Sequence, residues 1–437
     1  MKLVNRIKLN KNGSSIVLLA MVFVAMMLAI TASISIARAL VVKSECESFG
    51  HLWTKSILSE YDVHLLEEYG LQAFWGNDAE VQKRIDSYLD YSASSKLDAK
   101  IGKSSASLMG YELGDPENFK KAMKEAFATS AIDSVVNDSK RGERSMNTGG
   151  QHFGSRMIKN TVVLDTLPSG GISNTIDIDS IVAKLKQGNF LENLGSGITT
   201  AATEIAFLNK YFGTHISKGD FRDGYFCNEW EYVLNGKCDD EANFSACKRK
   251  IFLIRNALNL AYLYKDPEKM AVITAIAETL APGVAGVLSE AIIAEAWAAV
   301  ETESDMEILL DNGRVPFMKT SASWRTDIGA ILGKSEITGQ LSKEGKEILN
   351  DKRDEFENMS GANGRNGTND GQSYDDYLMA MIMLLNENVR TLRVMDIIQI
   401  NMKYWYYEDF NMMEYFTGVR FSIEANRRNY DFEDAYE

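Results

Sequence analysis

One apolar stretch near the start of the chain decides the fold: GSSIVLLAMVFVAMMLAITASISIA, from Gly13 to Ala37. It contains no charged residue. A helix that rises about 1.5 Å per residue would reach about 35 Å over this length, enough to cross a hydrocarbon core of about 30 Å. No later segment holds about 18 apolar residues in a row, so we expect a single transmembrane helix. The large side chains expected to face lipid or a membrane partner are Ile16, Leu19, Phe23, Met27 and Ile30.

The charges on either side of this stretch predict its orientation. The segment before it carries only basic charge, whereas the segment after it soon becomes acidic. The basic side chains before it are Lys2, Arg6, Lys8 and Lys11. Because positive charge is retained on the cytoplasmic side, we expect a cytoplasmic N-terminus and a bulk that is displayed outside, at the cell surface. A cleaved signal peptide is the alternative, but its apolar region is shorter, about 7 to 15 residues, and ends at small residues.

An apolar stripe predicts that the helix continues beyond the membrane. Its members recur at spacings of three and four residues and no Pro interrupts them: Val42, Cys46, Phe49, Trp53, Ile57 and Tyr61. We expect a rod whose lower half lies in lipid and whose upper half packs on a globular domain, as in pilins and their relatives. Cys46, Phe49 and Trp53 are the contact residues expected on this partner helix. A coiled-coil or juxtamembrane stalk is the alternative.

The composition limits the classes of protein that this chain can belong to. It has 437 residues, of which 45% are hydrophobic and 25% are charged, as in ordinary folded proteins. This composition argues against a disordered chain and against a polytopic membrane protein. The net charge of -14 argues against a nucleic-acid partner, which would need an excess of Lys and Arg.

The rest of the chain predicts an α+β fold that is mostly helical and has a few short strands. Helices are expected over residues 79–92, 117–136, 176–185, 199–212, 242–264, 374–386 and 388–403, and strands over 231–234 and 414–425. Residues 138–155 and 360–373 have the composition of loops. The expected divisions are a cytoplasmic tail at 1–12, a transmembrane helix at 13–37, its outward continuation at 38–75, a helical insert at 76–160 and the main extracytoplasmic domain at 161–437.

The sequence holds no convincing catalytic, cofactor or metal motif. The string GAILGKS at residues 329–335 resembles a phosphate loop but has one residue too few between its first Gly and the Gly-Lys pair. The four histidines are scattered and lack metal-ligand spacing. The acids Glu301, Glu303, Asp305 and Glu307 lack the central Gly of a calcium loop, and we expect them to form a solvated helix face. We therefore expect no enzyme activity, no cofactor and no metal.

The cysteines leave two disulfide pairings open. On the predicted topology Cys227, Cys238 and Cys247 lie on the oxidising side of the membrane, where disulfides form. Cys227 with Cys238 is the first candidate pair, and Cys238 with Cys247 is its rival, because sequence alone does not fix connectivity. Four free and buried thiols are the third alternative.

Several blocks of sequence resemble a family of membrane-anchored proteins. They include GSSIV at 13–17, ILSEYD at 57–62, LLEEYGL at 65–71, EWEYVLNGK at 229–237, RNALNL at 255–260 and GRVPFMKT at 313–320. The family is catalogued as a domain of unknown function, number 5702, and its members are found beside Tad-type pilus genes in Gram-positive bacteria. The resemblance implies an extracytoplasmic component of a pilus or secretion system, similar to TadE-like pseudopilins with a large added domain.

One departure from the pilin pattern bears on the expected role. Prepilins that are cleaved by a prepilin peptidase carry a Glu five positions after the cleavage Gly, but counting from Gly13 this position is Leu18. The departure implies a minor or membrane-retained component rather than a major filament subunit. The expected partners are the lipid bilayer, pilus or secretion-platform membrane proteins and further copies of the chain. A free-standing adhesin or ligand-binding ectodomain is the alternative function, and a surface hydrolase is a third.

Overall fold

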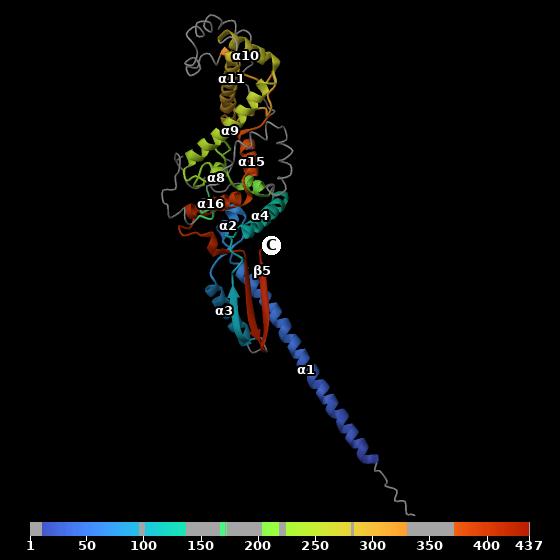
Figure 1. Ribbon diagram of the computed structural model, residues 1–437. Coiled ribbons are helices and arrows are strands. Elements are labelled where there is room, and N and C mark those ends of the chain that lie inside the picture. The colour runs from blue at the N-terminus through green and yellow to red at the C-terminus, as the bar shows by residue number, and fades with distance from the viewer. Residues whose placement is uncertain are drawn as a thin grey trace, which may run out of the picture. The chain divides into compact units, whose positions relative to one another are not determined.

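The computed structural model describes residues 11–95, 101–136, 167–170, 172, 203–217, 224–280, 284–329 and 371–436. These residues are mostly helical and include a few short strands, which confirms the predicted fold class (Figure 1). They form two compact units. Unit 1 contains residues 1–63, 72–115 and 413–437, and unit 2 contains residues 64–71 and 116–412.

Unit 1 combines a long helix with an antiparallel sheet. Its elements are α1 (Lys11–Leu58), β1 (Phe74–Trp75), α3 (Asp78–Ser95), β2 (Ile101–Ser107), β3 (Tyr415–Phe416), β4 (Gly418–Ala425) and β5 (Arg428–Ala435). The three longer strands form one sheet in the order β2-β4-β5, and β1 pairs with β3. Because β2 pairs with β4, residues from opposite ends of the chain share this sheet.

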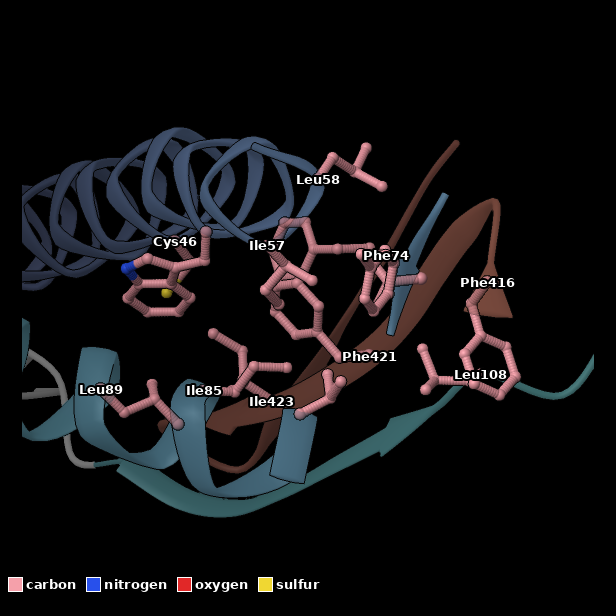
Figure 2. Close-up of a cluster of buried hydrophobic side chains, with 14 of the residues drawn as sticks. Cys46, Ile57, Leu58, Phe74, Ile85, Leu89, Leu108, Phe416, Phe421 and Ile423 are labelled. Atoms are coloured by element: carbon pink, nitrogen blue, oxygen red, sulfur yellow. The ribbon is translucent and has the colours of Figure 1, made fainter. Parts of the chain in front are cut away.

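The predicted stripe on α1 forms the core of unit 1 (Figure 2). Val42, Cys46, Trp53 and Ile57 are buried in one apolar cluster with side chains of α3, β2, β4 and β5, and Phe49 packs against it. Gly50 allows the closest approach, because a Cβ atom there would lie 2.2 Å from the ring of Phe432. The stripe therefore packs on a globular domain, as predicted, although α1 ends at Leu58 and Tyr61 lies outside it.

Unit 2 is helical over most of its described length. Its helices are α2 (Val63–Tyr69), α4 (Pro116–Val136), α8 (Glu229–Asn235), α9 (Asp240–Leu263), α10 (Pro267–Leu280), α11 (Val284–Leu310), α15 (Tyr374–Leu384) and α16 (Glu387–Trp405). Residues 203–211 are also helical, and the 3-10 helix η1 (Met412–Glu414) precedes β3. Trp297 and Trp324 anchor an apolar cluster that α9, α10 and α11 share.

The structure corrects one predicted element and extends another. Residues 231–234 were expected to form a strand, but they belong to α8, which ends where Gly236 adopts a left-handed φ of 61° and donates its amide to Tyr232. Tertiary burial of α8 overrides the strand propensity of its aromatic and β-branched residues. The single strand expected over 414–425 is divided into β3 and β4, and β5 follows and completes a hairpin with β4. The helix expected over 176–185 and the loop at 138–155 lie outside the described residues.

Candidate functional site

The apolar half of α1 is the first candidate site. Within the described part of the chain, one helix is long and apolar enough to cross a membrane, and it covers Ser15–Leu58. The predicted anchor side chains Ile16, Leu19, Phe23, Met27 and Ile30 are each between 50% and 70% exposed. Exposed apolar surface on this scale is unfavourable in water and marks a contact with lipid or protein. This half of α1 is compatible with a single membrane anchor or a signal sequence.

The three residues expected on the partner helix lie in the core of unit 1 instead of on a free surface. Cys46 and Trp53 are buried, and the ring of Phe49 stacks on that of Trp53 with centroids 5.9 Å apart. Burial raises the pKa of the Cys46 thiol, and Glu45 and Glu47 raise it further. These side chains hold α1 against its own sheet, so a partner would meet other residues of the helix.

The structure does not show the candidate disulfide. Cys227 and Cys238 are free thiols, as are Cys46 and Cys247. Burial raises the pKa of Cys247 to about 12, and Asn235 donates a hydrogen bond to its sulfur at 3.0 Å. A thiol with such a pKa is a poor nucleophile at neutral pH, so Cys247 acts as a packing residue.

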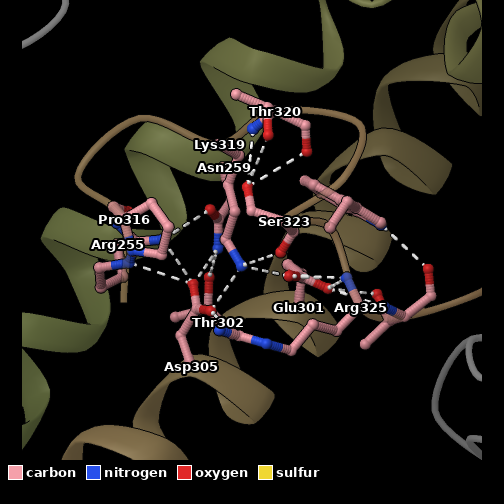
Figure 3. A network of polar contacts seen from close by, with 12 residues as sticks. Arg255, Asn259, Glu301, Thr302, Asp305, Pro316, Lys319, Thr320, Ser323 and Arg325 are labelled. Atoms are coloured by element: carbon pink, nitrogen blue, oxygen red, sulfur yellow. Dashed lines mark hydrogen bonds and ion pairs between the residues drawn. The ribbon is translucent and has the colours of Figure 1, made fainter. Parts of the chain in front are cut away.

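The second candidate site is a buried ionic network in unit 2 (Figure 3). It joins α9, α11 and the segment that follows α11. Its side chains are Arg255, Asn259, Glu301, Thr302, Asp305, Lys319, Ser323 and Arg325. The side chains of Arg255, Glu301, Asp305 and Lys319 are fully buried. Charges removed from water are costly unless they are paired, so the pairing in this network decides its stability.

Asp305 is the centre of this network. Its Oδ2 atom accepts hydrogen bonds from Nη2 of Arg255 at 2.6 Å and from Nδ2 of Asn259 at 3.0 Å. Its Oδ1 atom accepts from Nζ of Lys319 at 2.7 Å and from Nη1 of Arg325 at 2.8 Å. Burial by itself would raise the pKa of Asp305, but Arg255 and Lys319 outweigh it and hold that pKa below its usual value. Nε of Arg255 also donates to Oδ2 at 3.1 Å, so Asp305 is an ionised carboxylate that accepts three hydrogen bonds at Oδ2 and two at Oδ1.

Glu301 fixes the segment after α11 in the same network. Its carboxylate accepts from the backbone amide of Thr326 at 2.9 Å, from the hydroxyl of Thr326 at 2.8 Å and from the ammonium of Lys319. The expectation of a solvated acidic face is thus wrong for Glu301 and Asp305 and correct for Glu303 and Glu307, which are exposed. A spacing of four residues places the two buried acids on one side of α11 and the two exposed acids on another.

A second group of buried acids surrounds α8. Glu229 accepts hydrogen bonds from the amide of Gly213 and from the side chain of Asn401, both at 2.9 Å. Glu231 accepts from the amide of His215 at 3.0 Å and from the hydroxyl of Tyr374 at 2.9 Å. Burial raises the pKa of Glu229 to about 8 and that of Glu231 to about 7. Both carboxyls therefore hold a proton over much of the neutral range.

Sequence reasoning did not single out these acids as functional. Their only signal was position, because both stand in the otherwise aromatic and apolar string EWEYVLN. Asp240 belongs to the same group and accepts from the amides of Cys227 at 2.8 Å and Asn228 at 3.0 Å. No group of three His, Cys, Asp or Glu side chains suited to a metal ion occurs in the described ranges. What the acids do here is bind backbone amides and fix the chain around α8.

The comparisons with known proteins define the class of this chain. A family described as a family of unknown function, DUF5702, matches residues 155–427, which is more than half of the chain. The chain belongs to this family. No curated protein and no solved structure matches it.

Proposed function

We propose that this chain is a single-pass membrane protein with a cytoplasmic N-terminus and an extracytoplasmic bulk, and that it is a non-enzymatic component of a Tad-like type IV pilus or a pilus-related secretion system. The observation that carries the proposal is the division of α1. One half of this continuous helix is apolar and exposed, and the other half is the central element of the core of unit 1. A membrane-spanning helix that continues into a folded domain couples the movement of that domain to the part of the helix in the membrane.

The division of α1 favours a retained anchor over a signal sequence. The apolar half runs without a break into the buried half, where Val42, Trp53 and Ile57 lie in the core. A signal sequence has a shorter apolar region and ends at a cleavage site of small residues. Here the residues that follow the apolar run are helical and packed from Val42 onward.

The pilus assignment rests on two further points of support. Several sequence blocks between residues 13 and 320 resemble proteins encoded beside Tad-type pilus genes. In addition, unit 1 has a long N-terminal helix whose outer half lies against an antiparallel sheet, the arrangement that pilins use. The position of Leu18, where processed prepilins carry Glu, supports a membrane-retained or minor role.

The polar sites of unit 2 favour a structural role over catalysis. Asp305 and Glu301 are saturated by donors from their own unit, and Glu229 and Glu231 are buried. An acid–base catalyst must reach the proton that it transfers to or from a substrate. These carboxyls instead hold helices and backbone amides together.

The decisive experiment captures the neighbours of the apolar half of α1 in the native host. A photoreactive amino acid replaces Phe23, which is exposed on the apolar half, or Leu52, which is exposed on the half that packs on the sheet. Phe49 and Trp53 are unsuitable positions because they belong to the core. We expect the probe at position 23 to crosslink to lipid and to pilus or secretion-platform membrane proteins, and the chain to resist extraction from membranes by carbonate.

Three results would separate the parts of the proposal. A chain that is released by carbonate, or that lacks residues 13–37 in its mature form, would overturn the anchor. Crosslinks to lipid but to no pilus or secretion-platform protein, at normal abundance of the chain, would overturn the pilus role and favour a free-standing surface receptor. The probe at position 52 shows which captured proteins depend on the membrane-embedded half.

A further inference from the structure

The contacts between α1 and β5 show that the two elements run in the same direction. A Cβ atom at Gly50 would touch the ring of Phe432. One turn further along α1, the hydroxyl of Thr54 lies 3.4 Å from the carboxylate of Asp434. One more turn along, the hydroxyl of Tyr436 donates to the carbonyl of Leu58 at 2.5 Å. Residues of α1 that lie further from its apolar half therefore contact residues that lie nearer the C-terminal end of β5.

The same register places the turn between β4 and β5 at the edge of the apolar half. From Phe432 back to Arg428 a strand covers about 13 Å, at about 3.3 Å per residue. The same length of helix is about nine residues, which leads from Gly50 back to Val41. Val41 is exposed and lies about one helical turn beyond Ala37, the last residue of the apolar run. The β4–β5 turn is therefore level with a part of α1 just beyond the apolar run (Figure 1).

Two other elements of unit 1 end at the same level. Strand β2 begins there, because Ile101 pairs with Ala425. Helix α3 ends there, because it runs antiparallel to β2: Asp78 accepts from the amide of Leu108 at 2.8 Å, and Asp86 accepts from the hydroxyl of Ser104 at 2.5 Å. The next turns of α3 carry Tyr91, which is 80% exposed. Tyr side chains are favoured where lipid meets water.

Charge changes sign along this unit. We call the end nearest the apolar half the basic rim, and its basic side chains are Arg38, Lys43, Lys103, Arg427 and Arg428, all exposed. The acids at this end are Glu45, Glu47, Asp90 and Glu424, and Glu47 pairs with Lys43 at 3.6 Å. Further along β5 the charges are acidic, at Asp431, Glu433 and Asp434. Basic residues thus lie toward the membrane, and the acidic end of β5 lies away from it.

The backbone conformation of the β4–β5 turn does not favour an arginine at position 427. Asn426 and Arg427 are the two residues between β4 and β5, and both have positive φ, at 51° and 65°. Two-residue turns of this kind favour Asn followed by Gly, because Gly adopts positive φ without strain. Here Arg427 occupies the second position. Within the described residues neither Arg427 nor Arg428 forms an ion pair, so packing inside the unit does not account for them.

We propose that the basic rim docks on anionic phospholipid headgroups of the membrane that α1 spans. This inference rests on the proposed membrane anchor and adds the orientation of unit 1, whose sheet would stand upright on the lipid surface. The headgroup phosphates would accept hydrogen bonds from Arg427 and Arg428, and the ring of Tyr91 would lie at the interface. Each basic residue near an anionic surface changes association about fivefold, so the two turn arginines together account for about 30-fold.

The test uses the full chain in lipid nanodiscs that contain a nickel-chelating lipid. A nitroxide is attached to Asn429→Cys, beside the turn, or to Met109→Cys, just beyond the opposite end of β2, in a chain that carries Cys227→Ser and Cys238→Ser. Met109 is 81% exposed and serves as the matched control. We expect strong nickel-dependent relaxation at position 429 and little at position 109 when the disc contains phosphatidylglycerol. Replacing it with phosphatidylcholine should weaken the effect at 429, because the turn stays level with the same part of α1 but loses the anionic headgroups.

A charge variant completes the design. Arg427→Asn combined with Arg428→Gln removes both charges, and Asn tolerates the positive φ. We expect this variant to lower the docked-to-undocked ratio about 30-fold in phosphatidylglycerol discs, whereas Lys121→Gln with Lys124→Gln in unit 2 should leave it unchanged. Equal relaxation at 429 and 109, or equal relaxation in both lipids, would overturn the docking while the anchor stands. A chain that does not incorporate into discs would overturn the anchor itself.

Discussion

Unit 1 and unit 2 are held together by different kinds of buried side chain. The core of unit 1 is an apolar cluster between a helix and a sheet, in which Trp53 packs near Phe421 with ring centroids 6.2 Å apart. Unit 2 buries charged groups in addition to an apolar cluster, with Arg255 and Lys319 each paired to Asp305 away from water. Unit 1 therefore tolerates exchange of similar apolar residues, whereas unit 2 depends on the geometry of particular charges.

The difference matches what each unit has to do in the proposed role. An apolar interface between α1 and the sheet contains few titratable groups, so its free energy changes little with pH, which suits a unit beside a membrane. Buried charges contribute little net stability, because desolvation offsets attraction, but they penalise any arrangement that leaves one of them unpaired. Unit 2 therefore gains a specific arrangement of α9, α11 and the segment after α11.

The largest effect is expected from breaking the ionic network at its centre. Asp305→Asn leaves Arg255, Lys319 and Arg325 buried around a neutral amide, which should cost about 4 kcal/mol of the free energy of unfolding of unit 2. Hydrogen exchange of peptides from both units, measured on the full chain, should show faster exchange in α9 and α11 only. Asp311→Asn, at an exposed position after α11, is the control and should change little. Unchanged exchange in α9 and α11 would refute the network's role.

A somewhat smaller effect is expected from emptying the core of unit 1. Trp53→Ala removes the side chain that fills the space between α1 and β4, at a cost of about 3 kcal/mol in the stability of unit 1. The same exchange experiment should show loss of protection in β4 and β5 and none in α9. Leu52→Ala is the matched control, because Leu52 is the neighbouring residue and is exposed. Equal effects of the two variants would contradict the burial of the stripe.

The two units should also respond differently to pH. The pKa of Glu229 rises from an ordinary 4.5 to about 8 in the folded protein. Between these two pH values the carboxyl is protonated in the folded state and ionised in the unfolded state. The stability of unit 2 should therefore fall as pH rises from about 4.5 to 8, by about 2 kcal/mol or more. Denaturant unfolding at pH 5, 6.5 and 8 measures this slope. Glu229→Gln should reduce this slope to the part that Glu231 contributes, and the slope of unit 1 should stay near zero.

The smallest effect is expected from an exposed ion pair in unit 1. Lys55 lies 3.0 Å from the carboxylate of Asp434, but its side chain is 69% exposed. Solvent screens such pairs, so Lys55→Gln should change the stability of unit 1 by less than about 0.5 kcal/mol. Thermal unfolding at low and high salt measures the difference. If Lys55→Gln lowered the free energy of unfolding as much as Asp305→Asn does, burial would not explain the difference between the exposed ion pair and the buried ion pairs.

Local patterns predicted the long elements well. The uncharged run at 13–37, the stripe at Val42, Cys46 and Trp53, and the helical periods of α4, α9 and α16 each depend on residues close together in sequence. The prediction for α8 failed because its aromatic and β-branched residues favour a strand in isolation, and burial in unit 2 decides for a helix. The strand β2 was missed because IGKSSAS has no apolar alternation and exists through its pairing with β4.

The candidate sites divide in the same way. The exposed apolar side chains of α1 could be named from sequence, because one helix suffices to define them. The ionic network could not, because Arg255 and Lys319 are far from Asp305 in sequence and meet it only when α9, α11 and the following segment pack together. The same limit applied to the basic rim, which combines Arg38 with Arg427 from the other end of the chain.

The sequence by itself determined one apolar helix, its charged flanks and the stripe that continues it, because helical period and hydropathy are properties of neighbouring residues. The tertiary structure alone decided that this stripe faces its own sheet, that Glu301 and Asp305 are buried while Glu303 and Glu307 are exposed, and that the β4–β5 turn lies level with a part of α1 just beyond the apolar run. Each of these depends on which distant segments pack together, and packing is a property of the whole fold.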